Sequence, residues 1–200
     1  MSGVFITGTD TGCGKTYVTV WLARYLRRCG LDIGVMKPIS TGSARDDDAR
    51  FLKNKLKLKD PLRLINPIHL KAPLAPLAAA KLEKRNLKLE TAIQAYRQLK
   101  KRHGIVLIEG IGGVLVPITG KLLVVDLIKR LKLPAIIVAR AGLGTINHTL
   151  LTVEALRRRN IPIMGIIING YRGKDRAEKS NAAIIERLTN LPVLAQLPWR

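Results

Sequence analysis

The segment Gly8-Thr-Asp-Thr-Gly-Cys-Gly-Lys-Thr16 is the part of the sequence that decides the fold. It follows a short apolar run, Val4–Thr7, and it opens a stretch from about Lys15 to Cys29 whose apolar side chains share one helical face. A glycine-rich turn between a strand and a helix points backbone amides, and the positive end of the helix dipole, at phosphate oxygens. In such a loop Lys15 reaches the β- and γ-phosphates and the Thr16 hydroxyl binds Mg²⁺. The segment therefore predicts a site for a nucleoside triphosphate.

The spacing of this loop departs from the usual pattern. Five residues separate Gly8 from Gly14 instead of four, and Thr9 stands where the first glycine usually lies. The alternative is a glycine-rich turn with an incidental Gly-Lys-Thr sequence. The strand before the loop and the helix after it favour phosphate binding. We expect Cys13 to be a small apolar filler, although a reactive thiol at a helix start is the other interpretation.

Beyond the loop, short apolar runs alternate with amphipathic segments. This alternation is typical of a parallel sheet covered by helices on both faces. We therefore predict an α/β fold, a P-loop NTPase-like three-layer sandwich with a mainly parallel central sheet, in one domain over residues 1–200. We expect strands at 4–7, 33–36, 105–108, 135–139, 163–168 and 193–197, helices at 15–29, 45–58, 90–102, 121–132, 146–158 and 175–189, and a proline-rich loop at 66–76.

Ligands of such sheets bind beyond the carboxyl ends of the strands, where several polar residues fall. Lys37 follows a predicted strand and could neutralise charge that develops during phosphoryl transfer, or it could be a surface lysine. Mg²⁺ needs several oxygen ligands. Glu109 ends a buried strand and is either such a ligand or part of a salt bridge. The run Asp46-Asp47-Asp48 offers another ligand, or it is a solvated cluster at a helix start.

The segment Gly142-Leu-Gly-Thr-Ile-Asn147 precedes another predicted helix. Its free backbone amides could bind a carboxylate. It could equally be a plain loop with a helix cap, and the residues leave both interpretations open.

The composition is 47% hydrophobic and 24% charged, which is ordinary for a globular protein. We see no bilayer-length apolar run and no signal peptide, so we expect a cytoplasmic protein. Lysine and arginine number 35 against 14 acidic residues, a formal net charge of +21. One interpretation of such a charge is that the protein binds nucleic acid or an anionic membrane. Few aromatic residues lie among the scattered basic ones, so we expect a solvated basic surface and neither a specific nucleic acid nor a membrane.

Several segments occur in this order along the chain: Gly8–Thr16, Lys37-Pro-Ile-Ser-Thr-Gly42, Ala72-Pro-Leu-Ala-Pro76, Glu109-Gly-Ile-Gly-Gly113, Gly142-Leu-Gly-Thr-Ile-Asn-His148, Asn169 and Pro198-Trp199. Taken together, they resemble dethiobiotin synthetase of biotin synthesis. The resemblance covers essentially the whole chain. It implies that 7,8-diaminononanoate (7,8-diaminopelargonate) and CO₂ or bicarbonate react with ATP and Mg²⁺ through a carbamate that is phosphorylated and then closed to a cyclic urea. It also implies a homodimer with active sites at the subunit interface.

The resemblance also implies roles for single residues. Thr11, Lys15 and Lys37 would act in catalysis, and Thr16, Asp48 and Glu109 would bind the metal. The nucleotide would contact Thr11, Gly12, Cys13, Gly14, Lys15, Thr16 and Tyr17, with Asn169 reading the base and Pro198 and Trp199 lining it. The substrate would contact Thr41 and Gly112, and its carboxylate would contact Gly144, Thr145, Ile146 and Asn147.

Other enzyme classes share this type of loop. Partitioning-type P-loop ATPases, which bind DNA or membranes, carry a signature lysine five residues before the phosphate lysine, and this position is Asp10 here. Amide-forming synthetases of the cobalamin pathway usually carry an extra glutaminase domain, for which 200 residues leave no room. A pure nucleic-acid-binding module would need a recognition motif, and we find none.

Overall fold

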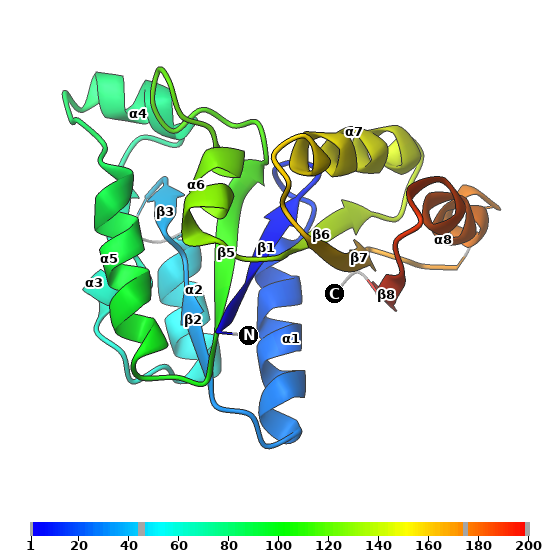
Figure 1. Ribbon diagram of the computed structural model, residues 1–200, viewed down its shortest axis with the longest axis horizontal. Coiled ribbons are helices and arrows are strands. Elements are labelled where there is room, and N and C mark those ends of the chain that lie inside the picture. Colours follow the sequence, from blue (N-terminus) through cyan, green and yellow to red (C-terminus); the bar gives the residue numbers. More distant parts are fainter. Residues whose placement is uncertain (1, 44–46, 174–175, 199–200) are drawn as a thin grey trace.

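The structure is a computed structural model that describes residues 2–43, 47–173 and 176–198. Within these residues, six strands form one sheet in the order β2-β5-β1-β6-β7-β8, and all neighbours are parallel (Figure 1). The predicted mainly parallel central sheet is confirmed. The strands are β1 (Gly3–Gly8), β2 (Ile33–Met36), β5 (Ile105–Gly113), β6 (Ala135–Arg140), β7 (Ile163–Asn169) and β8 (Val193–Leu197).

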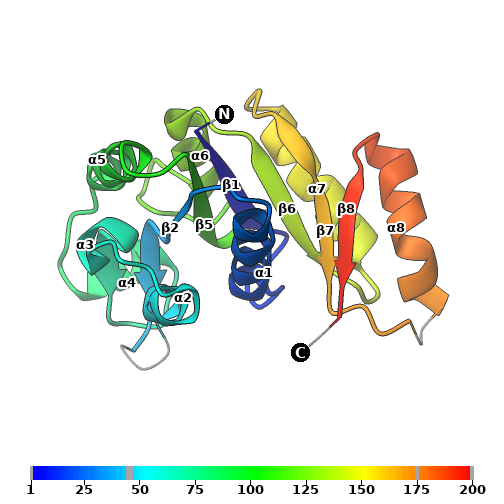
Figure 2. The same ribbon diagram turned by 90° about the horizontal axis from the view of Figure 1, so that it is seen from below.

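The strands are apolar because helices cover both faces of the sheet. On one face, α1 and α2 pack on a core that contains Ile6 and Val138. On the other face, α5, α6, α7 and α8 pack on a core that contains Phe5 and Ile137. Figure 2 shows α1 and α7 on opposite sides of the sheet, so the predicted three layers are confirmed. The helices of these two layers are α1 (Lys15–Arg28), α2 (Asp48–Leu56), α5 (Leu89–Lys100), α6 (Val124–Leu131), α7 (Thr145–Arg157) and α8 (Arg176–Thr189).

Four short elements lie outside the predicted ones. β3 (Ile39–Thr41) and β4 (Ile68–Leu70) pair in parallel as a small second sheet. The prediction of a loop at 66–76 is therefore wrong at β4. The helices α3 (Leu62–Ile65) and α4 (Pro76–Leu82) also lie outside the predicted helices. Elements of this length are too short to show a hydrophobic period.

Several element boundaries differ from the prediction by a few residues, and two of these differences have a clear local reason. β5 continues through Glu109 into three glycines, where apolar periodicity gives no signal. Gly110 is needed there because a Cβ atom would come within 2.8 Å of the Phe5 ring. α6 begins only at Val124, because the Asp126 carboxylate accepts a hydrogen bond from the Leu123 amide at 2.9 Å and caps the helix there.

None of the helices within residues 2–43, 47–173 and 176–198 is both long enough and apolar enough to cross a membrane.

Candidate functional site

The phosphate loop forms the turn between β1 and α1. Gly12 and Gly14 have φ angles of 70° and 94°, which glycine adopts without the strain that other residues suffer. A Cβ atom at Gly14 would come within 2.0 Å of the Asn169 Nδ2 atom, which donates to the Cys13 carbonyl at 3.1 Å. The loop can therefore fold tightly at the N-terminus of α1, where backbone amides suit an anion.

Lys15 begins α1, and its side chain folds back over the loop. Its ammonium donates to the Asp10 carbonyl at 2.9 Å, and the residue is only 7% exposed. Burial is the main cause that holds the pKa of Lys15 below its ordinary value, and the positive charge of Lys37 lowers it further. Two cations thus lie close enough to influence each other, and an anion between them would relieve their repulsion.

Lys37 follows β2 and is buried, so the alternative of a surface lysine is wrong. Its Nζ atom lies 2.7 Å from Glu109 Oε1, 2.9 Å from Asp48 Oδ2 and 2.9 Å from the Gly110 carbonyl oxygen. Burial alone would lower the pKa of Lys37, but the two carboxylates outweigh burial and raise it above its ordinary value. The Lys37 ammonium is therefore a fixed positive charge.

The Thr16 hydroxyl lies between the two carboxylates. Its oxygen is 2.8 Å from Glu109 Oε1 and 3.1 Å from Asp48 Oδ1. Burial acts to raise the pKa of Asp48, but Lys37 and the hydrogen bond from Thr16 hold it below its ordinary value. Glu109 is 0% exposed, and its Oε2 atom has no hydrogen-bond partner among the residues that the structure describes. These hard oxygen donors suit Mg²⁺, and the unpartnered Oε2 leaves one of them open to it.

Of the two aspartates of this run that the structure describes, Asp48 is the one whose side chain faces this site. Asp47 instead caps α2, since its carboxylate accepts from the Ala49 amide at 3.0 Å. Asp46 lies outside the described residues. Between Asp47 and Asp48, the geometry therefore favours Asp48 as a residue of this site.

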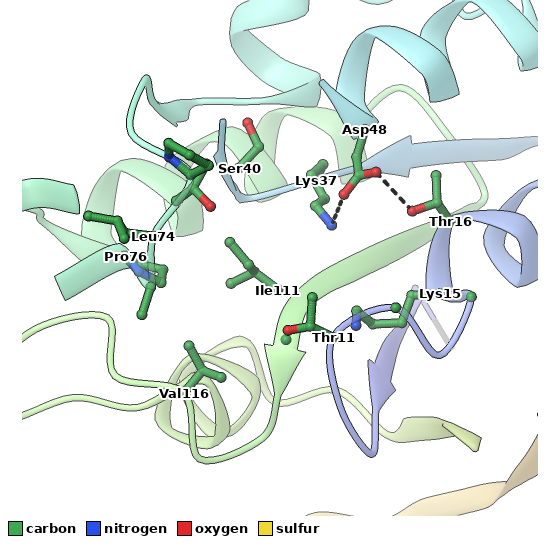
Figure 3. Close-up of a pocket in the computed structure, with 16 residues that line it drawn as sticks. Thr11, Lys15, Thr16, Lys37, Ser40, Asp48, Leu74, Pro76, Ile111 and Val116 are labelled. Atoms are coloured by element: carbon green, nitrogen blue, oxygen red, sulfur yellow. Dashed lines mark hydrogen bonds and ion pairs between the residues drawn. The ribbon is translucent and has the colours of Figure 1, made fainter. Parts of the chain in front are cut away.

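One end of a cavity of about 700 Å³ is polar and is lined by Lys15, Thr16, Lys37 and Asp48 (Figure 3). Glu109 lies behind Lys37 and Thr16, with which it forms hydrogen bonds, and does not line the cavity itself. Its other end is apolar, with Leu74 and Pro76 on one side and Ile111 and Val116 on the other. A ligand that carries both anionic and aliphatic parts fits such a cavity. Of the residues predicted for the site, those that line the cavity are Thr11, Gly12, Gly14, Lys15, Thr16, Lys37, Thr41, Asp48 and Gly112.

The remaining nucleotide-site candidates that the structure describes lie outside this cavity. Cys13 is fully buried and packs into the core on the α1 side of the sheet, as expected of an apolar filler. Tyr17 lines a separate hollow beside Phe51, between α1 and α2. Asn169 is buried below the loop. Pro198 is exposed after β8, and Trp199 lies outside the described residues.

The segment Gly144–Asn147 forms the start of α7 and is not part of this chain's own cavity. Gly144 is the N-cap residue, with a φ angle of 87°, and no side chain caps the helix. Thr145 is buried, and its hydroxyl has no partner among the described residues. Asn147 is exposed. The Thr145 amide donates to the Gly142 carbonyl oxygen at 3.3 Å. The amides that follow it in the first turn have no acceptor within the helix and can bind an anion.

Sequence reasoning missed two contributions to the site. The apolar wall around Leu74 and Pro76 comes from the segment 72–76. This segment is one of those that resemble the synthetase family, but the sequence indicated no binding role for it. Arg140 ends β6, and its guanidinium donates to the Thr11 carbonyl of the phosphate loop at 2.7 Å. The rule that singled out Glu109, a polar residue at a strand's carboxyl end, also applies to Arg140.

The chain is similar to known proteins over its whole length. A family model described as an AAA domain matches residues 2–200. An ATP-dependent dethiobiotin synthetase from Anaeromyxobacter dehalogenans (strain 2CP-C) is 48% identical over 202 residues, which cover 100% of this chain and 91% of the relative. The synthetase of the same name from Bacillus licheniformis is 43% identical, and the match covers 99% of this chain and 86% of that relative. The synthetase from Nitrosopumilus maritimus is 38% identical, and the match covers 100% of this chain and 90% of that relative.

This chain belongs to the ATP-dependent dethiobiotin synthetase family. The fold of this synthetase family member is also similar to that of a ParA family ATPase from Chlorobium tepidum TLS, with a TM-score of 0.61. The two sequences are 13% identical, and the match covers 100% of this chain and 86% of the ATPase. That likeness concerns the P-loop fold alone.

Proposed function

We propose that the chain catalyses the ATP-dependent formation of dethiobiotin from 7,8-diaminononanoate and CO₂ in biotin biosynthesis, and that residues 1–200 act as one synthetase domain. The observation that carries this proposal is the single cavity that joins the phosphate loop and Lys37 to an apolar wall. A nucleoside triphosphate can bind at the phosphate loop and Lys37, and the aliphatic chain of the diamine suits the apolar wall.

The proposed reaction has three steps. One amine of the substrate captures CO₂ and loses a proton, which yields a carbamate. The carbamate oxygen attacks the γ-phosphorus of ATP, which forms a carbamic-phosphoric anhydride and releases ADP. The second amine then attacks the carbamoyl carbon, closes the cyclic urea, and releases phosphate and a proton.

The main barrier to the second step is electrostatic, because an anion must approach a polyanion. Lys15 and Lys37 lie at this point and reduce the repulsion. Thr11 lines the same part of the cavity, where its hydroxyl can contact the transferring phosphate. No protein nucleophile is needed, and the side chains act by positioning and by charge.

We propose that Thr16, Asp48 and Glu109 hold Mg²⁺. The unpartnered Glu109 Oε2 atom and the hydroxyl between the two carboxylates support this set. When bound, the ion neutralises charge on the β- and γ-phosphate oxygens. Lys37 holds both carboxylates in place, because it contacts each of them, and it keeps the pKa of Asp48 below its ordinary value.

We propose that the chain acts as a homodimer, in which the start of the partner's α7 helix completes the substrate site. The amides of residues 144–147 would then bind the substrate carboxylate. Two observations support this arrangement. The segment lies outside the chain's own cavity, and Leu143 beside it is 92% exposed, as a residue at a subunit interface would be in one isolated chain. Asn169, Pro198 and Trp199 are proposed to contact the nucleotide base.

We propose small-molecule partners, a cytoplasmic location, and neither nucleic acid nor membrane as specific partners. The surroundings of several basic residues support this proposal. Several basic side chains donate to backbone carbonyl oxygens of their own chain and so have a structural use. They are Arg24, Arg27, Lys53, Arg85, Arg140 and Arg157.

The experiment that tests the proposed function measures phosphate release from ATP and Mg²⁺ in bicarbonate buffer, with and without 7,8-diaminononanoate. We expect release to depend on the diamine and to fall by at least roughly a hundredfold in Lys37→Ala, because the lost charge stabilises the transition state. The exposed Arg97→Ala is the matched cationic control. Phosphate release that does not depend on the diamine but increases with DNA or lipid would favour a partitioning-type ATPase instead.

A further inference from the structure

Asn66 is tied to the backbone of the catalytic lysine. It ends α3, and its side-chain amide donates to the Lys37 carbonyl at 2.7 Å. The preceding residue, Ile65, accepts from the Lys37 amide, also at 2.7 Å. Both backbone hydrogen-bonding groups of Lys37 are therefore held by residues 65 and 66. Asn66 is only 8% exposed, so water competes poorly for these contacts.

The same side chain also joins the two strands of the small second sheet. Its Nδ2 atom donates to the Ile68 carbonyl of β4 at 3.3 Å, and its Oδ1 atom accepts from the Ser40 hydroxyl of β3 at 2.9 Å. The amide nitrogen thus faces two carbonyl oxygens and the amide oxygen faces a hydroxyl. Only one orientation of an amide satisfies all of these partners, and neither a carboxylate nor an aliphatic side chain can replace it.

Lys37 needs such support because of its place in the fold. β2 is an edge strand of the main sheet, and its ladder to β5 ends with Met36 and Ile108. Lys37 is the next residue, so the ladder gives it no partner on either side. Its ammonium must nevertheless meet three acceptors, Glu109, Asp48 and the Gly110 carbonyl, at 2.7 to 2.9 Å. A shift of the backbone at this point would move the charge from the reacting phosphate.

We propose that Asn66 is a positioning residue for the reaction, and that its amide holds the Lys37 backbone so that the ammonium faces the transferring phosphoryl group. This inference rests on the role of Lys37 in the proposed function. Asn66 does not line the cavity that contains Lys37 and the phosphate loop. It acts through Lys37, and its loss therefore changes the rate of the chemical step more than it changes binding.

The first test is Asn66→Asp, which keeps the size of the side chain and the acceptor for Ser40 but removes the donor to Lys37. We expect kcat for diamine-dependent phosphate release to fall about 30-fold or more, since a misplacement of about 1 Å can cost a hundredfold. We expect KM for ATP to stay within roughly threefold of the wild type, because the phosphate loop is untouched. Asn66→Ser is too short to reach the Lys37 carbonyl, and we expect the same loss of kcat from it.

A double-mutant cycle with Lys37 separates positioning from a general structural role. If Asn66 acts only through Lys37, adding Asn66→Asp to Lys37→Ala lowers the single-turnover rate by less than about twofold. A further loss as large as that in the wild-type background would overturn the inference. Thr189→Val is the stability control, because it removes a buried hydrogen bond to the Ile185 carbonyl in α8, away from the cavity. It should lower the thermal midpoint without lowering kcat.

The outcomes distinguish this inference from the proposed function. A wild-type enzyme that is active with the diamine, together with folded Asn66→Asp or Asn66→Ser at full kcat, would overturn the positioning role and leave the function standing. A wild-type enzyme with no diamine-dependent turnover would overturn both. A fall in kcat with little change in KM, absent in the Lys37→Ala background, is the result that we expect.

Discussion

Lys37 and Glu109 form a fully buried ion pair, with 2.7 Å between Nζ and Oε1 and side-chain exposures of 2% and 0%. The pair joins the end of the edge strand β2 to the neighbouring strand β5, directly below the phosphate loop. A buried pair of this kind contributes little net stability compared with two apolar residues, but it is costly to break from one side only. The pair therefore favours a functional interpretation over a purely structural one.

The buried pair predicts a characteristic pattern of stability losses. Lys37→Met leaves Glu109 without its cation and should lower the free energy of unfolding by roughly 3–5 kcal/mol. The double change Lys37→Met with Glu109→Gln leaves no buried charge at either position and should cost less than Lys37→Met alone. Urea unfolding at neutral pH, without nucleotide, measures both variants. Losses that simply add would contradict the account.

The close approach of Gly14 and Asn169 predicts a specific loss of nucleotide binding. In Gly14→Ala the new Cβ atom would come within 2.0 Å of the Asn169 amide, so the loop must move. We expect ATP affinity to fall at least about tenfold, because the loop amides are displaced from the phosphates. Gly30→Ala is the matched control, since Gly30 also has a positive φ angle, of 82°, with nothing within 4 Å of a Cβ atom. Calorimetric titration with ATP compares the two, and equal losses would argue against the clash.

Arg140 predicts a smaller effect on the same loop. Its guanidinium donates to the Thr11 carbonyl at 2.7 Å and lies 3.6 Å from an Asp10 carboxylate oxygen. The side chain is half exposed, so we expect Arg140→Ala to raise KM for ATP by only about 3- to 10-fold, with kcat less affected. Steady-state kinetics measure this change. An unchanged KM would mean that the loop keeps its shape without Arg140.

His103 predicts a pH dependence of stability far from the cavity. Burial acts to lower the pKa of His103, but hydrogen bonds to Asp32 and Asp60 at 2.9 and 2.8 Å raise it above its ordinary value. A raised pKa in the folded state means that the charged histidine adds stability below about pH 6.5, which is lost as the pH rises through the folded-state pKa. The thermal midpoint of the wild type should therefore exceed that of His103→Asn by more at about pH 5.5 than at about pH 9. An equal or reversed difference would contradict this sign.

The main sheet was predictable because its strands are buried on both faces and read as continuous apolar runs. Val4–Thr7 and 135–139 stand out for this reason. The second sheet was not predictable, because β3 and β4 are three residues each and are held by contacts such as those of Asn66 rather than by their own pattern.

The phosphate site was predictable because its residues follow strands and have a known spacing. Lys15, Thr16, Lys37 and Asp48 meet at one cavity end, as strand-end positions imply. The contacts behind them were not predictable. Asn66 lies 29 residues from Lys37 in the chain, and no local pattern links an amide to a distant carbonyl.

The central claim is that the chain builds a cyclic urea from the diamine and CO₂ at the expense of ATP. The most direct measurement supplies ¹³C-bicarbonate, ATP, Mg²⁺ and 7,8-diaminononanoate and follows dethiobiotin by mass spectrometry. We predict one labelled carbon in each product molecule, one ADP formed for each dethiobiotin, and product formation at least roughly a hundredfold slower in Lys37→Ala. ADP formation without labelled dethiobiotin would contradict the account and leave only a nucleotide-hydrolysing P-loop.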